Sequence, residues 1–62
     1  MIIEVGTKLK DSRNRILYVK QIWFEKYLSG WKTIIQVVDK YNCLEEYFAS
    51  DIGYELNIEE NE

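Results

Sequence analysis

The sequence predicts an all-β fold, a small five-stranded barrel with one short helical turn before the last strand. Short runs alternate apolar and polar residues, and clusters of Asp, Ser, Asn and Gly separate these runs. Residues 16–39 hold the densest β-branched and aromatic content of the chain. A chain of 62 residues forms one domain. We assign residues 1–58 to the barrel and expect residues 59–62 to form a frayed acidic tail.

The first strand is predicted over residues 1–9, where Val5 and Leu9 face one side and Gly6 marks a bend. Residues 11–15, with the sequence DSRNR, are predicted to form a turn. Asp, Ser and Asn favour turns because their side chains bond to the nearby backbone and because Asn and Asp tolerate left-handed geometry.

A long hairpin is predicted at the centre of the barrel, from residues 16–25 and 31–39. Residues 26–30 form its loop, with Gly30 available for a positive φ angle. Both faces of the first of these runs are apolar, so one face fills the core and the other must be covered by another element, a partner or a ligand. The pattern leaves the register of the hairpin open, and with it which tryptophan is buried.

The last third of the chain is predicted to complete the barrel. Asn42 is expected in the left-handed conformation of a tight turn, and Ser50 or Asp51 is expected to cap the helical turn. The tight turn, the fourth strand, the helical turn and the fifth strand are predicted over residues 40–43, 44–49, 50–53 and 54–58.

This pattern resembles the SH3-like barrels, including the Tudor and KOW-type variants. The resemblance covers nearly the whole chain and depends on the strand spacing, on Phe48 and Ile52 around the helical turn, and on Leu56, which would close the core. The chain is also similar to small barrels encoded by bacteriophages and mobile elements in its size, its acidity and its Lys, Ile, Tyr and Asn content. The resemblance implies a barrel that presents aromatic residues between its loops for recognition.

The composition argues against catalysis and against a metal or cofactor. The chain has no histidine, so it lacks the usual general base near neutral pH. Its one cysteine, Cys43, can form neither an intrachain disulfide nor a structural zinc site, and the three glycines make no phosphate loop. We therefore predict a non-enzymatic protein. The lone cysteine, the lack of a signal peptide and the absence of a long apolar run predict a cytoplasmic location.

The charge of the chain is unevenly distributed. The net charge is −3, but residues 1–20 carry +3 and residues 41–62 carry −7. Our leading hypothesis is a protein-interaction module that uses aromatic residues near the barrel ends or its acidic segment. A phage-encoded inhibitor or modulator of a host protein, such as a nuclease or defence protein, would fit this hypothesis. The candidate protein-binding residues are Trp23, Tyr27, Trp31, Tyr41, Glu45, Glu46 and Glu55.

Two alternatives use other surfaces. Small barrels can bind single-stranded nucleic acid by stacking bases on aromatic residues beside a basic groove, and the same chemistry would bind a small nucleotide. The acidic overall charge argues against this alternative. A homodimer formed through the two-faced hairpin is the other alternative. The candidate nucleic-acid-binding residues are Lys8, Lys10, Arg13, Arg15, Tyr18 and Lys20.

Overall fold

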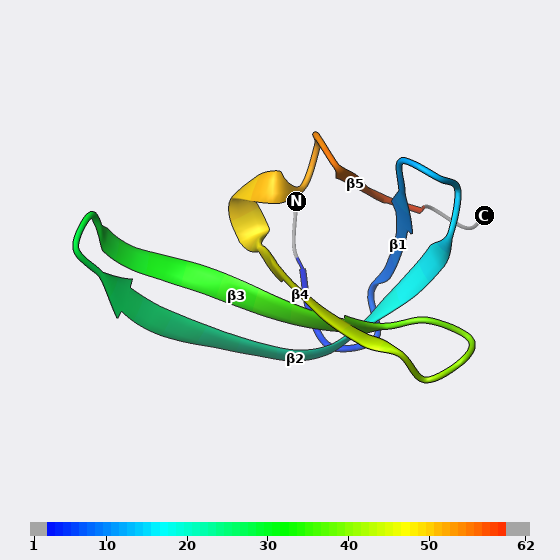
Figure 1. The fold of residues 1–62 in the computed structure, drawn as a ribbon, viewed down its shortest axis with the longest axis horizontal. Helices are drawn as coiled ribbons and strands as arrows, with labels where there is room; N and C mark the ends of the chain where they lie inside the picture. Colours follow the sequence, from blue (N-terminus) through cyan, green and yellow to red (C-terminus); the bar gives the residue numbers. More distant parts are fainter. Residues whose placement is uncertain (1–2, 60–62) are drawn as a thin grey trace.

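The computed structural model describes residues 3–59, which form five strands and one short 3₁₀ helix (Figure 1). The prediction of an all-β fold with a helical turn before the last strand is confirmed. The elements are β1 (Lys8–Asp11), β2 (Ile16–Tyr27), β3 (Gly30–Val38), β4 (Leu44–Phe48), the 3₁₀ helix η1 (Ala49–Asp51) and β5 (Leu56–Ile58).

The five strands form one antiparallel sheet in the order β4-β3-β2-β1-β5. The predicted closed barrel is not formed, because within residues 3–59 no strand pairing joins the edge strands β4 and β5. Between β4 and β5 the chain forms η1 and a turn instead of a strand. β5 has only three residues, and all three pair with β1. Figure 1 shows β1, β5 and η1 beside the inner part of the β2–β3 hairpin, while the outer part of the hairpin extends away from them.

The element boundaries differ from prediction in informative ways. The hairpin loop has two residues instead of five, because Tyr27 pairs with Gly30. Gly30 has φ 120°, so the predicted positive φ is confirmed. The prediction of a first strand before Lys8 is wrong for residues 3–7, where the chain turns at Gly6 and leaves Val5 exposed. Residues 1–2 and 60–62 of the predicted strand and tail lie outside the described residues.

Three corrections concern the last third of the chain. The fifth strand begins at Leu56, because the residues before it belong to a turn. The predicted side-chain cap on the helical turn is wrong, because η1 has no side-chain cap hydrogen bond. Glu59, which was assigned to the tail, donates its backbone N–H to the Lys8 carbonyl oxygen at 2.9 Å.

A β-bulge in β2 explains why both faces of this strand are apolar. The register passes from Val19↔Val37 to Gln21↔Gln36, so β2 has one residue more than β3 at Lys20. Side chains of successive residues in a strand alternate between faces, so the bulge reverses the alternation. Leu17 and Val19 therefore lie in the core before the bulge, and Ile22 packs against the same core after it.

The core lies on one face of the curved sheet. Leu56 is fully buried, as predicted, but Phe48 remains exposed and is not a core residue. Burying an aliphatic side chain of this size stabilises a fold by about 1.5–3 kcal/mol. The core residues are Leu9, Leu17, Val19, Ile35, Val37 and Leu56.

The other face carries a smaller apolar group. Ile34 is buried there, and its cross-strand partners are Trp23 on β2 and Phe48 on β4. Trp23 is half-buried, whereas Trp31 is 70% exposed. The structure thus decides which tryptophan takes part in packing, and it leaves the other on the surface of the hairpin end.

Candidate functional site

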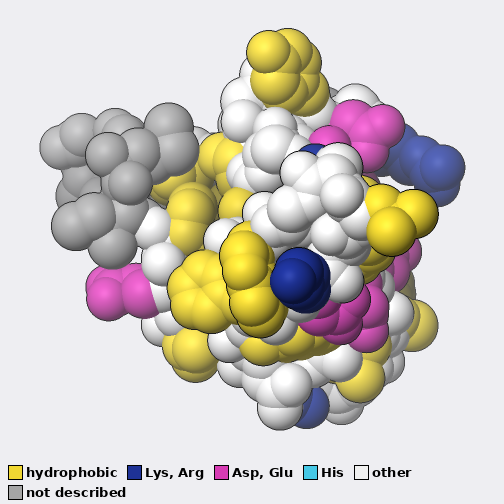
Figure 2. Space-filling model, turned by 90° about the vertical axis from the view of Figure 1, so that its left-hand side faces the viewer, with side chains coloured by type: hydrophobic (Ala, Val, Ile, Leu, Met, Phe, Trp, Pro, Cys, Tyr) yellow, Lys and Arg dark blue, Asp and Glu magenta, His cyan; other side chains and the backbone are white. Residues whose placement is uncertain are grey.

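The end of the β2–β3 hairpin exposes large hydrophobic side chains. The pairing of β1 with β2 stops at Tyr18, so the outer half of the hairpin extends past β1 (Figure 1). Phe24 and Trp31 are 69% and 70% exposed, and Leu28 at the tip is fully exposed. Figure 2 looks onto this end of the molecule and shows hydrophobic side chains gathered beside basic and acidic ones. Monomeric proteins rarely expose large contiguous apolar patches, so this end is a candidate interaction surface.

Glu25 holds two aromatic residues of the hairpin in place. Its carboxylate accepts hydrogen bonds from Trp23 Nε1 at 2.7 Å and from the Tyr27 hydroxyl at 2.9 Å. The bond from Trp23, followed by that from Tyr27, lowers the pKa of Glu25. The bond to Glu25 in turn raises the pKa of Tyr27. These three side chains share one face of β2, because their positions alternate along the strand.

A hollow of about 400 Å³, which we name the acidic hollow, lies next to Tyr27. The rings of Tyr27 and Phe48 meet edge to face, with centroids 5.7 Å apart. The hollow has three carboxylates, those of Glu46, Asp51 and Glu55. Within residues 3–59, none of them forms an ion pair. The ammonium of Lys32 lies 5.9 Å from the centroid of the Phe48 ring, so a cation can reach this ring. The acidic hollow is lined by Tyr27, Ile34, Glu46, Tyr47, Phe48, Asp51 and Glu55.

Two turns elsewhere in the molecule share one construction. In the turn Asp11–Arg15, Asp11 Oδ1 accepts the N–H groups of Arg13 at 2.9 Å and Arg15 at 2.8 Å. Asn14 donates its N–H to the Asp11 carbonyl oxygen at 3.0 Å, and the Asp11 N–H bonds to the Arg15 carbonyl oxygen at 3.1 Å. Asn14 has φ 65°, in the left-handed region.

The turn Asp39–Cys43 repeats this arrangement. Asp39 Oδ1 accepts the N–H groups of Tyr41 at 2.8 Å and Cys43 at 3.0 Å. Asn42 donates to the Asp39 carbonyl oxygen at 3.1 Å, the Asp39 N–H bonds to the Cys43 carbonyl oxygen at 3.2 Å, and Asn42 has φ 65° as predicted. The shared pattern is Asp-x-x-Asn-x, which our sequence analysis did not identify although its spacing is visible in both segments.

Arg15 joins the two turns to each other and to β4. Its Nε donates to Asp11 Oδ2 at 2.7 Å, its Nη2 donates to Glu45 Oε1 at 3.0 Å, and its Nη1 lies 3.8 Å from Asp39 Oδ2. The planar guanidinium suits this role because it can bind several carboxylates at once. Both carboxylates hydrogen-bonded to Arg15 raise its pKa.

The carboxylates around Arg15 all have a pKa below the ordinary value. Desolvation raises the pKa of Asp11, but the hydrogen bonds from Arg15 and Arg13 outweigh it. The backbone N–H of Cys43 is the main cause that lowers the pKa of Asp39. The hydrogen bond from Arg15 lowers the pKa of Glu45.

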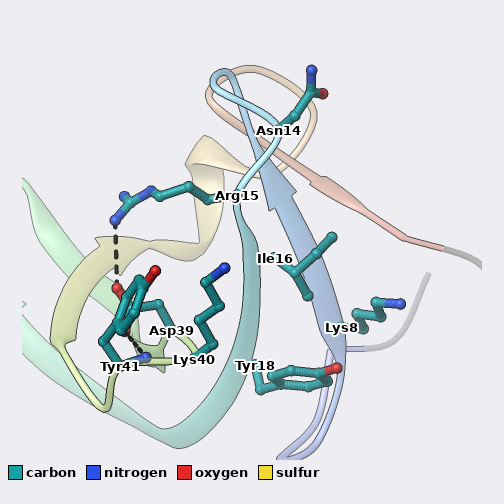
Figure 3. A pocket seen from close by; sticks show the side chains of 8 residues that line it. All are labelled: Lys8, Asn14, Arg15, Ile16, Tyr18, Asp39, Lys40 and Tyr41. Atoms are coloured by element: carbon teal, nitrogen blue, oxygen red, sulfur yellow. Dashed lines mark hydrogen bonds and ion pairs between the residues drawn. The ribbon is translucent and has the colours of Figure 1, made fainter.

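A second hollow, of about 450 Å³, lies between the two turns (Figure 3). We name it the tyrosine–lysine hollow. Tyr18 comes from β2 and Tyr41 from the second turn, while Lys8 and Lys40 come from β1 and from the second turn. Its lining consists of Lys8, Asn14, Arg15, Ile16, Tyr18, Asp39, Lys40 and Tyr41.

The structure regroups the candidate residues. Tyr27, Glu46 and Glu55 lie together in the acidic hollow, with Trp23 bonded to Glu25 nearby on β2, whereas Trp31 stands on the other face of the hairpin. Tyr41 lies instead with candidates of the nucleic-acid alternative, Lys8, Arg15 and Tyr18.

Several candidate residues already have partners within the chain. Glu45 and Arg15 bind each other, and Lys10 pairs with Glu59 at 3.4 Å. Arg13 and Lys20 are exposed and line neither hollow. Phe24, Phe48, Asp51 and Lys40 were not among the candidates, because their neighbours depend on strand register and on how the turns and η1 pack.

Comparison of the chain with protein-family models, with curated proteins and with solved structures gave no match. Among residues 3–59, no group of three or more His, Cys, Asp or Glu side chains is placed to hold a metal ion. In the same part of the chain, no helix is long and apolar enough to span a membrane.

Proposed function

We propose that this chain is a non-enzymatic protein-interaction module whose basic partner protein covers both faces of the hairpin end, with Trp31 and Phe24 on one face and the acidic hollow on the other. One observation carries the proposal: Tyr27, Glu46 and Glu55 come from β2, from β4 and from the turn before β5, yet they line the same hollow. We also propose that the fold is a variant of the SH3-like class. The five-stranded antiparallel sheet and the 3₁₀ turn before its last strand support this assignment.

The two parts of the surface would contribute differently to binding. Exposed aromatic side chains such as Trp31 and Phe24 lose much apolar area to water when a partner covers them, and such residues dominate binding energies. The carboxylates of Glu46, Asp51 and Glu55 would attract a Lys or Arg side chain of the partner and favour the correct orientation. Affinity would therefore depend mainly on the aromatic residues, and salt sensitivity mainly on the carboxylates.

A protein with a basic surface, as nucleic-acid-processing enzymes have, fits this chemistry. The origin of the chain from a phage or mobile element, and a host nuclease or defence protein as the partner, stay predictions. Glu45 takes no part in the proposed contact, because it is bonded to Arg15.

The test is a pull-down from a nuclease-treated bacterial lysate at low and high salt. We expect one stoichiometric protein, captured at least tenfold less by Trp31→Ser, and captured less by the double variant Glu46→Gln, Glu55→Gln at low salt only. Glu4→Gln is the matched control, since Glu4 is exposed and lines neither hollow. Capture of no protein, or equal capture by all variants, would contradict the proposal.

Self-association through the hairpin is separated from binding of a partner by sedimentation of the purified chain. A dimer would give a melting temperature that rises with protein concentration and a mass that Trp31→Ser halves. A monomer with a concentration-independent melt leaves the hairpin end free for another protein, as we expect.

A further inference from the structure

The tyrosine–lysine hollow is separate from the surface assigned to protein binding. Tyr18 lines this hollow and Tyr27 lines the acidic hollow, nine residues further along β2. A strand rises about 3.3 Å per residue, so the two positions are on the order of 30 Å apart. Ligands at the two sites would therefore not compete.

Two aromatic rings give the hollow flat apolar surfaces. Tyr18 is 45% exposed and Tyr41 is 73% exposed, and neither belongs to the core. Figure 3 shows the two rings on different sides of the hollow, with Ile16 beside Tyr18. Exposed tyrosines of this kind can stack on a planar heterocycle, because the faces of both rings are apolar.

Two ammonium groups lie beside these rings. Lys8 is the cross-strand partner of Tyr18, so the two side chains lie next to each other on the outer face of the sheet. Lys40 lies with its Nζ 5.1 Å from the centroid of the Tyr41 ring. Within residues 3–59, neither lysine forms an ion pair with a carboxylate, so both are available to an anion.

The other charged groups around the hollow are bonded to one another. Asp39 accepts two backbone N–H groups and faces Arg15, and the Arg15 guanidinium is bonded to Asp11 and Glu45. These bonds occupy Nε and Nη2 of Arg15 and place three carboxylates beside its charge. The three carboxylates also oppose an anion, so stacking must contribute more to binding than charge does.

We propose that the tyrosine–lysine hollow binds a nucleotide, with its base stacked on Tyr41 and its phosphate bound by Lys40 or Lys8. The volume of about 450 Å³ lies within the ordinary range for small-ligand sites. A free mononucleotide and a nucleotide within a single strand present the same chemistry. Because at most two lysines would contact phosphates, the affinity for a single strand should depend only weakly on salt. A plot of log K against log salt concentration should have a slope of roughly −1.4 or shallower.

The experiment is a titration of the ¹⁵N-labelled full chain, followed by amide shifts. The probes are AMP, CMP, adenosine, inorganic phosphate and an eight-nucleotide single strand. We expect AMP and CMP to shift the amides of Lys8, Tyr18 and residues 39–41. Adenosine should shift the same amides with weaker affinity, and inorganic phosphate should have little effect.

The variants separate the role of the rings from that of the charges. We expect Tyr41→Ala to weaken AMP at least tenfold, and Lys8→Gln with Lys40→Gln to weaken AMP but not adenosine. Tyr54→Ala is the matched control, since Tyr54 is 83% exposed and lines neither hollow. Unchanged amide shifts in the core, at Leu17, Val37 and Leu56, would show that each variant is folded.

Each outcome decides the proposal or its source. Equal affinity for AMP and the single strand identifies a free nucleotide, and tenfold tighter binding of the strand identifies single-stranded nucleic acid. The proposal is overturned if no probe shifts these amides at millimolar concentration, if phosphate alone reproduces the AMP shifts, or if Tyr54→Ala weakens AMP as much as Tyr41→Ala. None of these results depends on the hairpin end, so failure here leaves the proposed protein binding untouched.

Discussion

The turns Asp11–Arg15 and Asp39–Cys43 have the same backbone hydrogen bonds but different roles. In both, an Asp accepts two N–H groups and an Asn adopts φ 65°. The first turn ends in Arg15, which reaches across to Asp39 and Glu45. The second turn presents Lys40 and Tyr41 to the surface of a hollow. The Asp-x-x-Asn-x pattern thus builds the turn, and the variable positions decide whether its side chains bind other parts of the fold, as Arg15 does, or stay exposed at the hollow, as Lys40 and Tyr41 do.

Removal of the Asp side chain should break the first turn more severely than the second. Asp11→Ala loses two backbone bonds and the 2.7 Å bond from Arg15, whereas Asp39→Ala loses two backbone bonds and a pair at 3.8 Å. We expect the melting temperature to fall for both, by on the order of 5 °C or more for Asp11→Ala. Thermal unfolding followed by circular dichroism measures the difference, with Asp51→Ala as the control. An equal or larger fall for Asp39→Ala would contradict the asymmetry.

Replacement of Arg15 should separate the two turns without unfolding either. Arg15→Met removes the side-chain bonds to Asp11 and Glu45 but keeps the backbone bonds of the turn. We expect a melting temperature a few degrees lower, by roughly 2–5 °C. Arg15→Lys should recover only part of this loss, since an ammonium cannot replace the forked guanidinium. Full recovery by Lys would show that only the charge matters.

The stability of the protein should fall in acid because of the carboxylates around Arg15. The pKa of Asp11, Asp39 and Glu45 in the folded state lies below the ordinary values of 3.8, 3.8 and 4.5. As the pH falls, these carboxylates therefore bind protons in the unfolded chain before they do so in the folded protein. The stability that they contribute above about pH 4.5 is lost as the pH falls through their lower pKa values in the folded state.

Denaturant midpoints at pH 7, 5, 4 and 3 measure this loss. Arg15→Met should flatten the fall, because the hydrogen bond from Arg15 is the main cause for Glu45 and one of the causes for Asp11. Some dependence should persist, since the pKa of Glu25 is lowered by Trp23 and Tyr27. An identical pH profile for the variant and the parent would show that the Arg15 contacts do not form in solution.

The two turns should behave alike at their left-handed residues, Asn14 and Asn42. Asn14→Ala and Asn42→Ala put alanine at φ 65°, a left-handed conformation that Asn adopts more readily than alanine. Each variant should lose about 1–2 kcal/mol of stability. Asn14→Gly and Asn42→Gly should stay within about 0.5 kcal/mol of the parent, because glycine adopts this conformation freely. Equilibrium unfolding in urea checks the four variants. A large difference between the two sites would mean that Asn side-chain contacts differ between the turns.

Local features of this structure could be read from the sequence. The alternating runs predicted the strands, and the composition of Asp, Asn and Gly predicted both turns and the positive φ of Asn42 and Gly30. Such features depend on hydrogen bonds and sterics within about five residues, so the residue types suffice to predict them. The helical turn before the last strand was predicted for the same reason, but its side-chain cap was not formed.

Which residues meet across the chain depends on the assembled sheet. The bulge at Lys20 reverses the faces of β2, and this reversal packs Ile22 against the core and places Trp23 beside Ile34 on the other face. Neither the bulge nor the open sheet edge has a local sequence signal, because both depend on strand register and on the competition among long-range pairings.

The candidate sites show the same division between local and long-range information. The aromatic and charged residues of both hollows are visible in the sequence, and most are candidates from the sequence alone. Their grouping was not predictable, because Tyr27 and Glu55 line one hollow, and Arg15 binds Glu45, across more than 25 residues of chain. The sequence by itself determined an all-β chain with two Asp-Asn turns. The register of its strands determined where the charges meet the aromatic rings, because contacts between distant residues form only when the sheet is assembled.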